Sequence, residues 1–165
     1  MRTLVIGLGN PILTDDGVGV KVAYAVREAL ASGGHSDVTV TEASVGGLRL
    51  MELMVGYDRV VLIDALQHSD ARPGTIRRMT LEELRTISPT QHSTCAHDTS
   101  LVTALDLGRQ LGLPLPKEFT IYGVGVENVT WFGEQPTPAV AEAIPQVTAA
   151  VLAELSLMTA DTSPP

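Results

Sequence analysis

The sequence contains a single cysteine, Cys95, and only 4% of its 165 residues are aromatic. One cysteine excludes an internal disulfide framework and is typical of a reducing compartment, so we expect a cytoplasmic protein. The scarcity of aromatic side chains predicts a core of Val, Leu, Ile and Ala. We find no secretory signal and no apolar run of the about 20 residues that a membrane-spanning helix needs.

Basic residues are also scarce, with 11 Lys and Arg against 19 Asp and Glu and a net charge of −8. Nucleic acids and anionic membranes are bound largely through Lys and Arg, so we expect neither as a partner. Hydrophobic residues make up 44% and charged residues 18%, which excludes a disordered chain. The length suits one domain, expected over residues 1–158 with a frayed tail at 159–165, and we expect a monomer.

Short apolar runs, typical of buried strands, alternate with segments of helical spacing in the first part of the chain. The expected strands cover residues 3–6, 38–41 and 60–63, and the expected helices cover 17–30 and 48–55. This alternation predicts a parallel sheet whose strands are joined by right-handed crossovers.

The pattern changes after Asp64, where a short linker with Pro73 and Gly74 leaves no room for a crossover helix. We therefore expect strand 75–79 to be antiparallel and to lie at a sheet edge. The remaining expected elements are helices at 81–86, 99–111 and 138–157 and a strand at 119–126. The prediction is a three-layer α/β/α sandwich, with a mostly parallel twisted sheet of about five strands and one antiparallel edge strand.

Polar side chains capable of chemistry follow the predicted parallel strands, at the sheet edge where ligands bind in such folds. Asp15 and Asp16 come after the first strand, Asp64 follows the third, and His97 precedes the helix at 99. Two carboxylates and one imidazole form a ligand set that suits nickel, zinc or manganese.

Each of these residues also has a purely structural interpretation. Asp15 or Asp16 could cap the following helix, and Asp64 could stabilise a turn or a helix end. His97 could be an ordinary loop residue, with His92 nearby. The argument for function therefore depends on the convergence of three chain segments. A dinucleotide-binding fingerprint is excluded, because an isoleucine stands where its third glycine is required.

Several segments together resemble the hydrogenase maturation endopeptidases, which remove a C-terminal extension from the large subunit of nickel–iron hydrogenases. The first similar segment comprises residues 4–10 (LVIGLGN) and 14–17 (TDDG), and the second is 61–65 (VLIDA). The third is 97–101 (HDTSL), in which a histidine precedes a helix, and residues 120–124 (TIYGV) and 132–134 (FGE) complete the match. The resemblance follows nearly the whole chain in order.

The resemblance implies that Asp16, Asp64 and His97 bind a metal and carry the catalysis. Some relatives have Glu at the position of Asp16, and Asp keeps the charge with a shorter reach. His92 competes with His97, which we prefer because its spacing to the leucines of the following helix matches the family. No permanent cofactor is implied, because the nickel arrives already inserted in the hydrogenase precursor.

The resemblance also suggests residues that contact the substrate. Gly46 and Gly47 match a glycine-containing segment of the family and could line the cleft for the substrate tail, although a simple helix-start turn explains them equally well. Asn10, from the first motif, is the third expected substrate-binding residue. The expected partner is a nickel-loaded large-subunit precursor.

Two alternatives come from other functional classes. Peptidyl-tRNA hydrolases have an opening similar to residues 4–11 (LVIGLGNP), but they continue with a catalytic histidine, and this chain has none before His35. A tRNA substrate also fits poorly with the net charge of −8. The second alternative is a non-catalytic nickel-sensing or chaperone module on the same fold.

Overall fold

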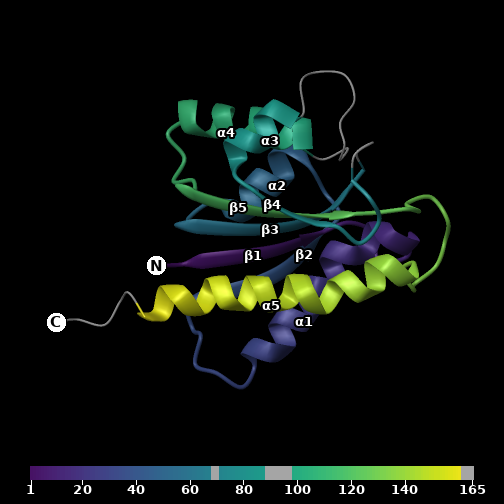
Figure 1. Ribbon diagram of the computed structural model, residues 1–165. Coiled ribbons are helices and arrows are strands. Elements are labelled where there is room, and N and C mark those ends of the chain that lie inside the picture. Colours follow the sequence, from purple (N-terminus) through teal and green to yellow (C-terminus); the bar gives the residue numbers. More distant parts are fainter. Residues whose placement is uncertain (68–70, 88–97, 161–165) are drawn as a thin grey trace.

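A computed structural model describes residues 1–67, 71–87 and 98–160, and these form a five-stranded sheet between two layers of helices (Figure 1). The strand order is β2-β1-β3-β5-β4. Its strands are β1 (Thr3–Leu8), β2 (Val38–Ala43), β3 (Arg59–Leu66), β4 (Ile76–Met79) and β5 (Glu118–Gly125). All neighbours pair in parallel except β4, which runs antiparallel to β5 at the sheet edge. The predicted three-layer architecture is confirmed.

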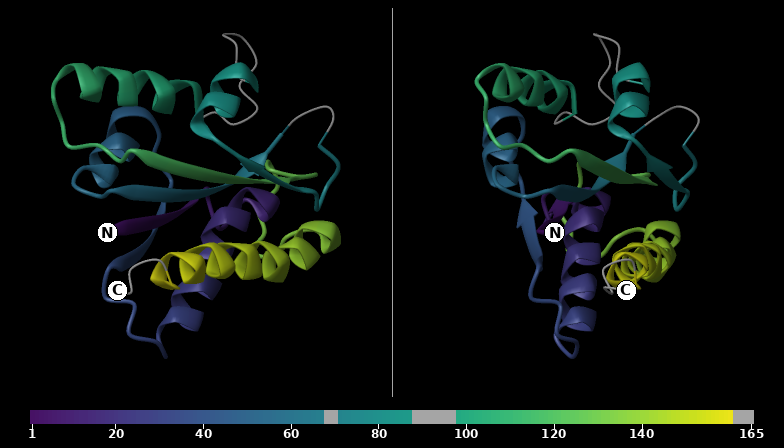
Figure 2. Two further views of the ribbon diagram at one scale, coloured as in Figure 1. Left: turned by 60° about the vertical axis from the view of Figure 1, so that its left-hand side comes forward. Right: turned by 90° about the vertical axis from the view of Figure 1, so that its left-hand side faces the viewer.

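Helices cover both faces of the sheet. They are α1 (Val18–Leu30), α2 (Gly47–Met54), α3 (Leu81–Ile87), α4 (Asp98–Gln110) and α5 (Pro138–Ala160), with a 3₁₀ turn, η1 (Thr14–Gly17), before α1. Helices α1 and α5 lie side by side on one face, and α2, α3 and α4 cover the other (Figures 1 and 2).

The two cores follow from the alternation of side chains along the central strands. In β3, Val60 and Leu62 face α2, α3 and α4, whereas Val61 and Ile63 face α1 and α5. A strand that is buried on both faces needs a continuous apolar run, which is what β1 and β3 provide. Both strands are buried along their whole length.

Strand β3 is longer than predicted. It continues through Asp64 to Leu66, with Asp64 paired to Gly123 and Leu66 paired to Gly125. A single carboxylate does not end a strand when the apolar residues after it keep their partners on the next strand. The expectation that the strand ends at Asp64 is therefore wrong, and Asp64 lies within the sheet.

Two expectations from the sequence about helix α5 are corrected by the structure. By length and composition, its 19 residues from Pro138 to Ser156, with a mean hydropathy of 1.2, could cross a membrane, contrary to our expectation from the sequence. In the fold, however, its Val147 and Val151 pack in the core with α1. The helix also extends to Ala160, into the expected tail, and residues 161–165 lie outside the described part of the chain.

Candidate active site

The carboxyl edge of the sheet brings the end of β1, the start of α1 and Asp64 together. Gly7 pairs with Ile63, so Asp64 lies level with the end of β1. A side chain at Gly19 would place its Cβ only 2.4 Å from the carbonyl oxygens of both Ile63 and Leu8. Glycine is therefore required where α1 packs against the edge between β1 and β3.

Asp16 is held against the end of β1. The Asn10 N–H donates a hydrogen bond to Asp16 Oδ2, at 2.8 Å. A Cβ added at Gly9, which has a φ of +127°, would lie 1.8 Å from the carbonyl oxygen of Asp16. The backbone of residues 9 and 10 thus holds the half-buried Asp16 in place, and no residue larger than glycine fits at position 9.

Asp64 is 5% exposed, and its Oδ1 accepts a hydrogen bond from the Ala65 N–H, at 2.8 Å. Because Asp64 alternates with Val60 and Leu62, its side chain belongs to the sheet face that α2, α3 and α4 cover. A buried carboxylate near a strand end, on the face that α4 covers, suits a metal ligand or a general base.

The histidine of the predicted ligand set lies outside the described residues, as do His92 and Cys95. Helix α4 begins at Asp98, one residue from the predicted position and directly after His97. Within the described ranges, no group of three or more His, Cys, Asp or Glu side chains is placed to hold a metal. The three-residue set therefore stays a prediction, of which the structure describes two carboxylates.

The expected substrate-binding residues lie at the same edge. Gly46 precedes α2, and Gly47 begins it with a φ of +57°, so the helix-start role of this pair is confirmed. Gly9 N–H donates to the carbonyl of Ala43, at 3.0 Å, which places the end of β2 beside that of β1. The side chain of Asn10 accepts a hydrogen bond from the Ile12 N–H, at 3.2 Å, and so supports the turn. Contact of these residues with substrate stays a prediction.

Asp15 has a role that the sequence did not reveal. It is fully buried, and its carboxylate accepts hydrogen bonds from the N–H groups of Glu127, Asn128 and Thr137 and from the Thr137 hydroxyl, at 2.7–3.0 Å. The interpretation of Asp15 or Asp16 as a helix cap is wrong, because Gly17 precedes α1 and no side chain caps it. Two consecutive aspartates were the available signal in the sequence, because only one of them is needed as a ligand and the other can have a structural role.

The loop after β5 forms a groove with the loop after β1. The groove has a volume of about 540 Å³ and is lined by residues that follow β1, β3 and β5 or precede α5: Thr14, Gln67, Glu127, Asn128, Val129, Thr130, Trp131 and Thr137. Trp131, which lines the groove, and its neighbour Phe132 are 73% and 84% exposed. Two adjacent aromatics in a loop give no periodic signal, and the sequence pointed to Phe132 only as part of the segment 132–134 of the family resemblance.

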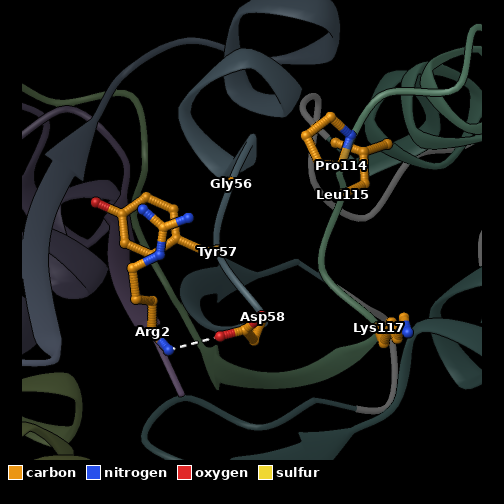
Figure 3. Close-up of a pocket in the computed structure, with 7 residues that line it drawn as sticks. All are labelled: Arg2, Gly56, Tyr57, Asp58, Pro114, Leu115 and Lys117. Atoms are coloured by element: carbon orange, nitrogen blue, oxygen red, sulfur yellow. Dashed lines mark hydrogen bonds between the residues drawn. The ribbon is translucent and has the colours of Figure 1, made fainter.

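A second cavity, of about 360 Å³, lies at the opposite edge of the sheet (Figure 3). There the guanidinium of Arg2 lies over the ring of Tyr57, 5.9 Å from its centre, and the Arg2 N–H donates to Asp58 Oδ2 at 2.7 Å. None of the predicted site residues lines this cavity. It therefore belongs to the surface at the amino ends of the strands.

A partly buried charge network joins α5 to the sheet away from the predicted site. Glu154 forms an ion pair with Arg59 and one at 2.9 Å with Arg78, and accepts hydrogen bonds from the hydroxyls of Thr120 and Tyr122 at 2.8 and 2.6 Å. Burial alone would raise the pKa of Glu154, but its hydrogen bonds to Arg78, Tyr122 and Thr120 and the charge of Arg59 lower that pKa to about 2. Burial, together with the Glu154 carboxylate, raises the pKa of Tyr122 to about 12.

Comparisons with known proteins give a consistent result. The sequence matches the hydrogenase maturation protease family over residues 20–154. It is 29% identical to the hydrogenase 2 maturation protease of Escherichia coli strain K12 over 154 residues, covering 92% of this chain and 91% of that protein. The fold superposes on the structure of the hydrogenase maturating endopeptidase HybD from E. coli with a TM-score of 0.79 at 29% identity, covering 96% and 94% of the two chains.

A more distant structure shows the same fold. The nickel–iron hydrogenase maturation protease HybD from Thermococcus kodakarensis is 23% identical, with a TM-score of 0.66, and the superposition covers 94% of this chain and 99% of that one. The family match and the E. coli relatives support an endopeptidase and give no support to a peptidyl-tRNA hydrolase or to a module without catalysis.

Proposed function

The chain belongs to the hydrogenase maturation protease family and is an endopeptidase, and from this premise we propose that it removes the C-terminal extension of a nickel–iron hydrogenase large-subunit precursor after nickel insertion. The observation that carries the proposal is the position of Asp16 and Asp64 at one edge of the sheet. Both residues lie where β1, β3 and the start of α1 meet.

Asp16, Asp64 and His97 engage the nickel that the precursor carries, so that the metal is part of the substrate. The two carboxylates and the imidazole supply ligands that suit this metal. A coordination that needs several thiolates takes them from the precursor, because this chain has a single cysteine. The protease thereby distinguishes a loaded precursor from an empty one.

Cleavage follows once the bound nickel has placed the scissile peptide beside the two carboxylates. A carboxylate or the metal activates the attacking water, or the metal polarises the carbonyl group of the scissile bond. Asp16 is oriented for this role by the Asn10 N–H, and Asp64 by its place within β3.

The test is a cleavage assay with purified protein and nickel-loaded precursor. Alanine at Asp16, Asp64 or His97 is expected to abolish the mass loss from the precursor while the circular dichroism spectrum stays unchanged. Asp58→Ala, an exposed aspartate at the opposite edge, is the matched control and should process normally. Normal cleavage by His97→Ala together with loss in His92→Ala would show that the histidine assignment is wrong.

The same assay separates catalysis from binding. A module that only senses nickel would form a stable complex with the precursor and leave its mass unchanged. We also propose that the protein is a cytoplasmic monomer. The single cysteine supports the cytoplasmic location, because it is typical of a reducing compartment.

A further inference from the structure

The loop after β1 and the loop after β5 are joined into one rigid unit at the carboxyl edge. Leu13 forms a parallel β-bridge with Gly133, whose N–H donates to the Ile12 carbonyl and whose carbonyl accepts from the Thr14 N–H, each at 2.9 Å. The Thr14 hydroxyl also donates to the carbonyl of Trp131, at 2.6 Å. Asp15 fixes the other end of this unit through its four hydrogen bonds. The two loops, about 120 residues apart in sequence, therefore hold a defined shape.

This unit exposes large apolar side chains, which we call the aromatic rim: Ile12, Trp131 and Phe132, with exposed fractions of 47%, 73% and 84%. Neither Trp131 nor Phe132 is needed for the core, since both belong to no buried cluster. Contiguous exposed apolar groups on rigid loops commonly mark a binding surface, because leaving them in water is unfavourable.

The rim is continuous with the candidate active site. Thr14 lines the groove beside the rim and precedes Asp16 by two residues, within the same 3₁₀ turn. Gln67 lines it as well and follows β3, the strand that carries Asp64. A chain lying in the groove would therefore run along the edge that presents both carboxylates.

The size and the charge of this surface favour a peptide segment over a second copy of this chain. Three such side chains expose roughly 400 Å², less than the roughly 800 Å² that each partner of a stable dimer usually buries. Among the residues that the structure describes, the groove is lined by one charged residue, Glu127, and by no Lys or Arg. An extended segment with apolar side chains and no acidic residue fits this lining.

We propose that the aromatic rim and its groove bind an extended apolar segment of the precursor next to the scissile bond. Ile12, Trp131 and Phe132 determine the specificity for this segment. This inference rests on the proposed function. The rim binds the segment, and the nickel-engaging residues then position the bond to be cleaved. Rim contacts contribute to binding of the substrate, so they act on KM more than on kcat.

Site-specific photo-crosslinking tests the location of the segment. Phe132 is replaced by p-benzoylphenylalanine in the otherwise intact protein, the nickel-loaded precursor is added, and the crosslinked peptide is identified by mass spectrometry. The expected product joins position 132 to the C-terminal segment around the cleaved bond. The control places the same probe at Leu111, which is 68% exposed just after α4, and should not give this product. Crosslinks to another part of the precursor or to a second copy of this chain would overturn the proposal.

Kinetics test the role of the rim in binding. The double variant Trp131→Ser and Phe132→Ser is expected to raise KM for the precursor about tenfold or more while kcat changes less than twofold. Leu111→Ser, the control, should leave both constants unchanged. An unchanged KM in the double variant would overturn the rim proposal while the proposed function stands. If wild-type protein does not process the precursor at all, the proposed function itself fails.

Discussion

Neighbouring aspartates in η1 face different partners. Asp15 turns into the protein and binds the loop between β5 and α5, whereas Asp16 turns to the end of β1. A buried carboxylate that accepts several backbone N–H groups is a structural anchor, because its charge is balanced by these hydrogen bonds. The doublet thus pairs an anchor with a candidate ligand.

The first residue-scale prediction concerns this anchor. Asp15→Asn should lower the free energy of unfolding by about 3 kcal/mol, because an amide replaces a charged acceptor of four hydrogen bonds. Urea denaturation measures this, and hydrogen exchange should accelerate at the amides of Glu127, Asn128 and Thr137. Asp58→Asn, which alters an exposed acceptor of one backbone N–H, should cost about 1 kcal/mol or less. Unchanged exchange at the three amides would contradict the anchor role.

The second concerns the glycine beneath Asp16. Gly9→Ala should destabilise the fold by about 3 kcal/mol or more, since its Cβ would collide with the Asp16 carbonyl at a positive φ. Displacing Asp16 should also abolish cleavage. Gly34→Ala is the control, because a Cβ there meets nothing within 4 Å and should change stability by less than about 0.5 kcal/mol. If both variants are equally stable, the packing described at the edge of the sheet is wrong.

Apolar runs in the sequence placed Asp15, Asp16 and Asp64 near the carboxyl ends of strands, and the family resemblance selected Asp16 over Asp15 as a candidate site residue. The sequence could not assign the separate role of Asp15, since that role depends on a loop more than 110 residues away. The aromatic rim was missed for the same reason, because Ile12 and Phe132 come together only through the bridge between Leu13 and Gly133.

At the scale of elements, α5 is held to the sheet by the charge network around Glu154 as well as by apolar packing. Arg59 begins a strand whose other charged residue is Asp64, and Glu154 lies in a helix rich in Ala and Val. Arg59 is the only basic residue of β3 and α5 has no basic residue, so an acidic residue of α5 was an available partner for Arg59. Their pairing was not predictable from periodicity, because it joins elements 95 residues apart.

This network makes stability depend on pH. The folded-state pKa of Glu154 lies at about 2, below its usual 4.5, so its stabilising effect is complete above pH 4.5 and is lost as the pH falls toward 2. We expect the loss to amount to about 2 kcal/mol once solvent screening is allowed for. The measurement is urea denaturation of wild type and Glu154→Gln between pH 7 and pH 2.5.

Glu154→Gln should be less stable than wild type at pH 7, because it leaves Arg59 buried beside a neutral side chain. The gap should narrow as the pH falls below 4.5. Glu142→Gln, an exposed change on the same helix, should match wild type throughout. A gap that stays constant down to pH 2.5 would contradict the network's role.

At the scale of the whole molecule, the parallel pairing of most strands and the antiparallel edge strand were predictable, whereas the strand order was not predicted. Crossover helices impose parallel neighbours, and the short linker after β3 forces β4 to run antiparallel. Element boundaries were less predictable, because pairing with β5 extends β3 to Leu66. Among the 19 acidic residues, Asp16 and Asp64 lie at the candidate site, and Asp15 and Glu154 hold parts of the fold together.

The central claim is nickel-dependent processing of a hydrogenase large subunit by this chain. Its most direct test is the mass of that subunit in cells with and without the protein, grown with nickel and starved of it. The account predicts a shortened subunit only when both protein and nickel are present, and the full-length precursor in the other three cases. A shortened subunit in cells that lack the protein, or in nickel-starved cells that contain it, would contradict the account.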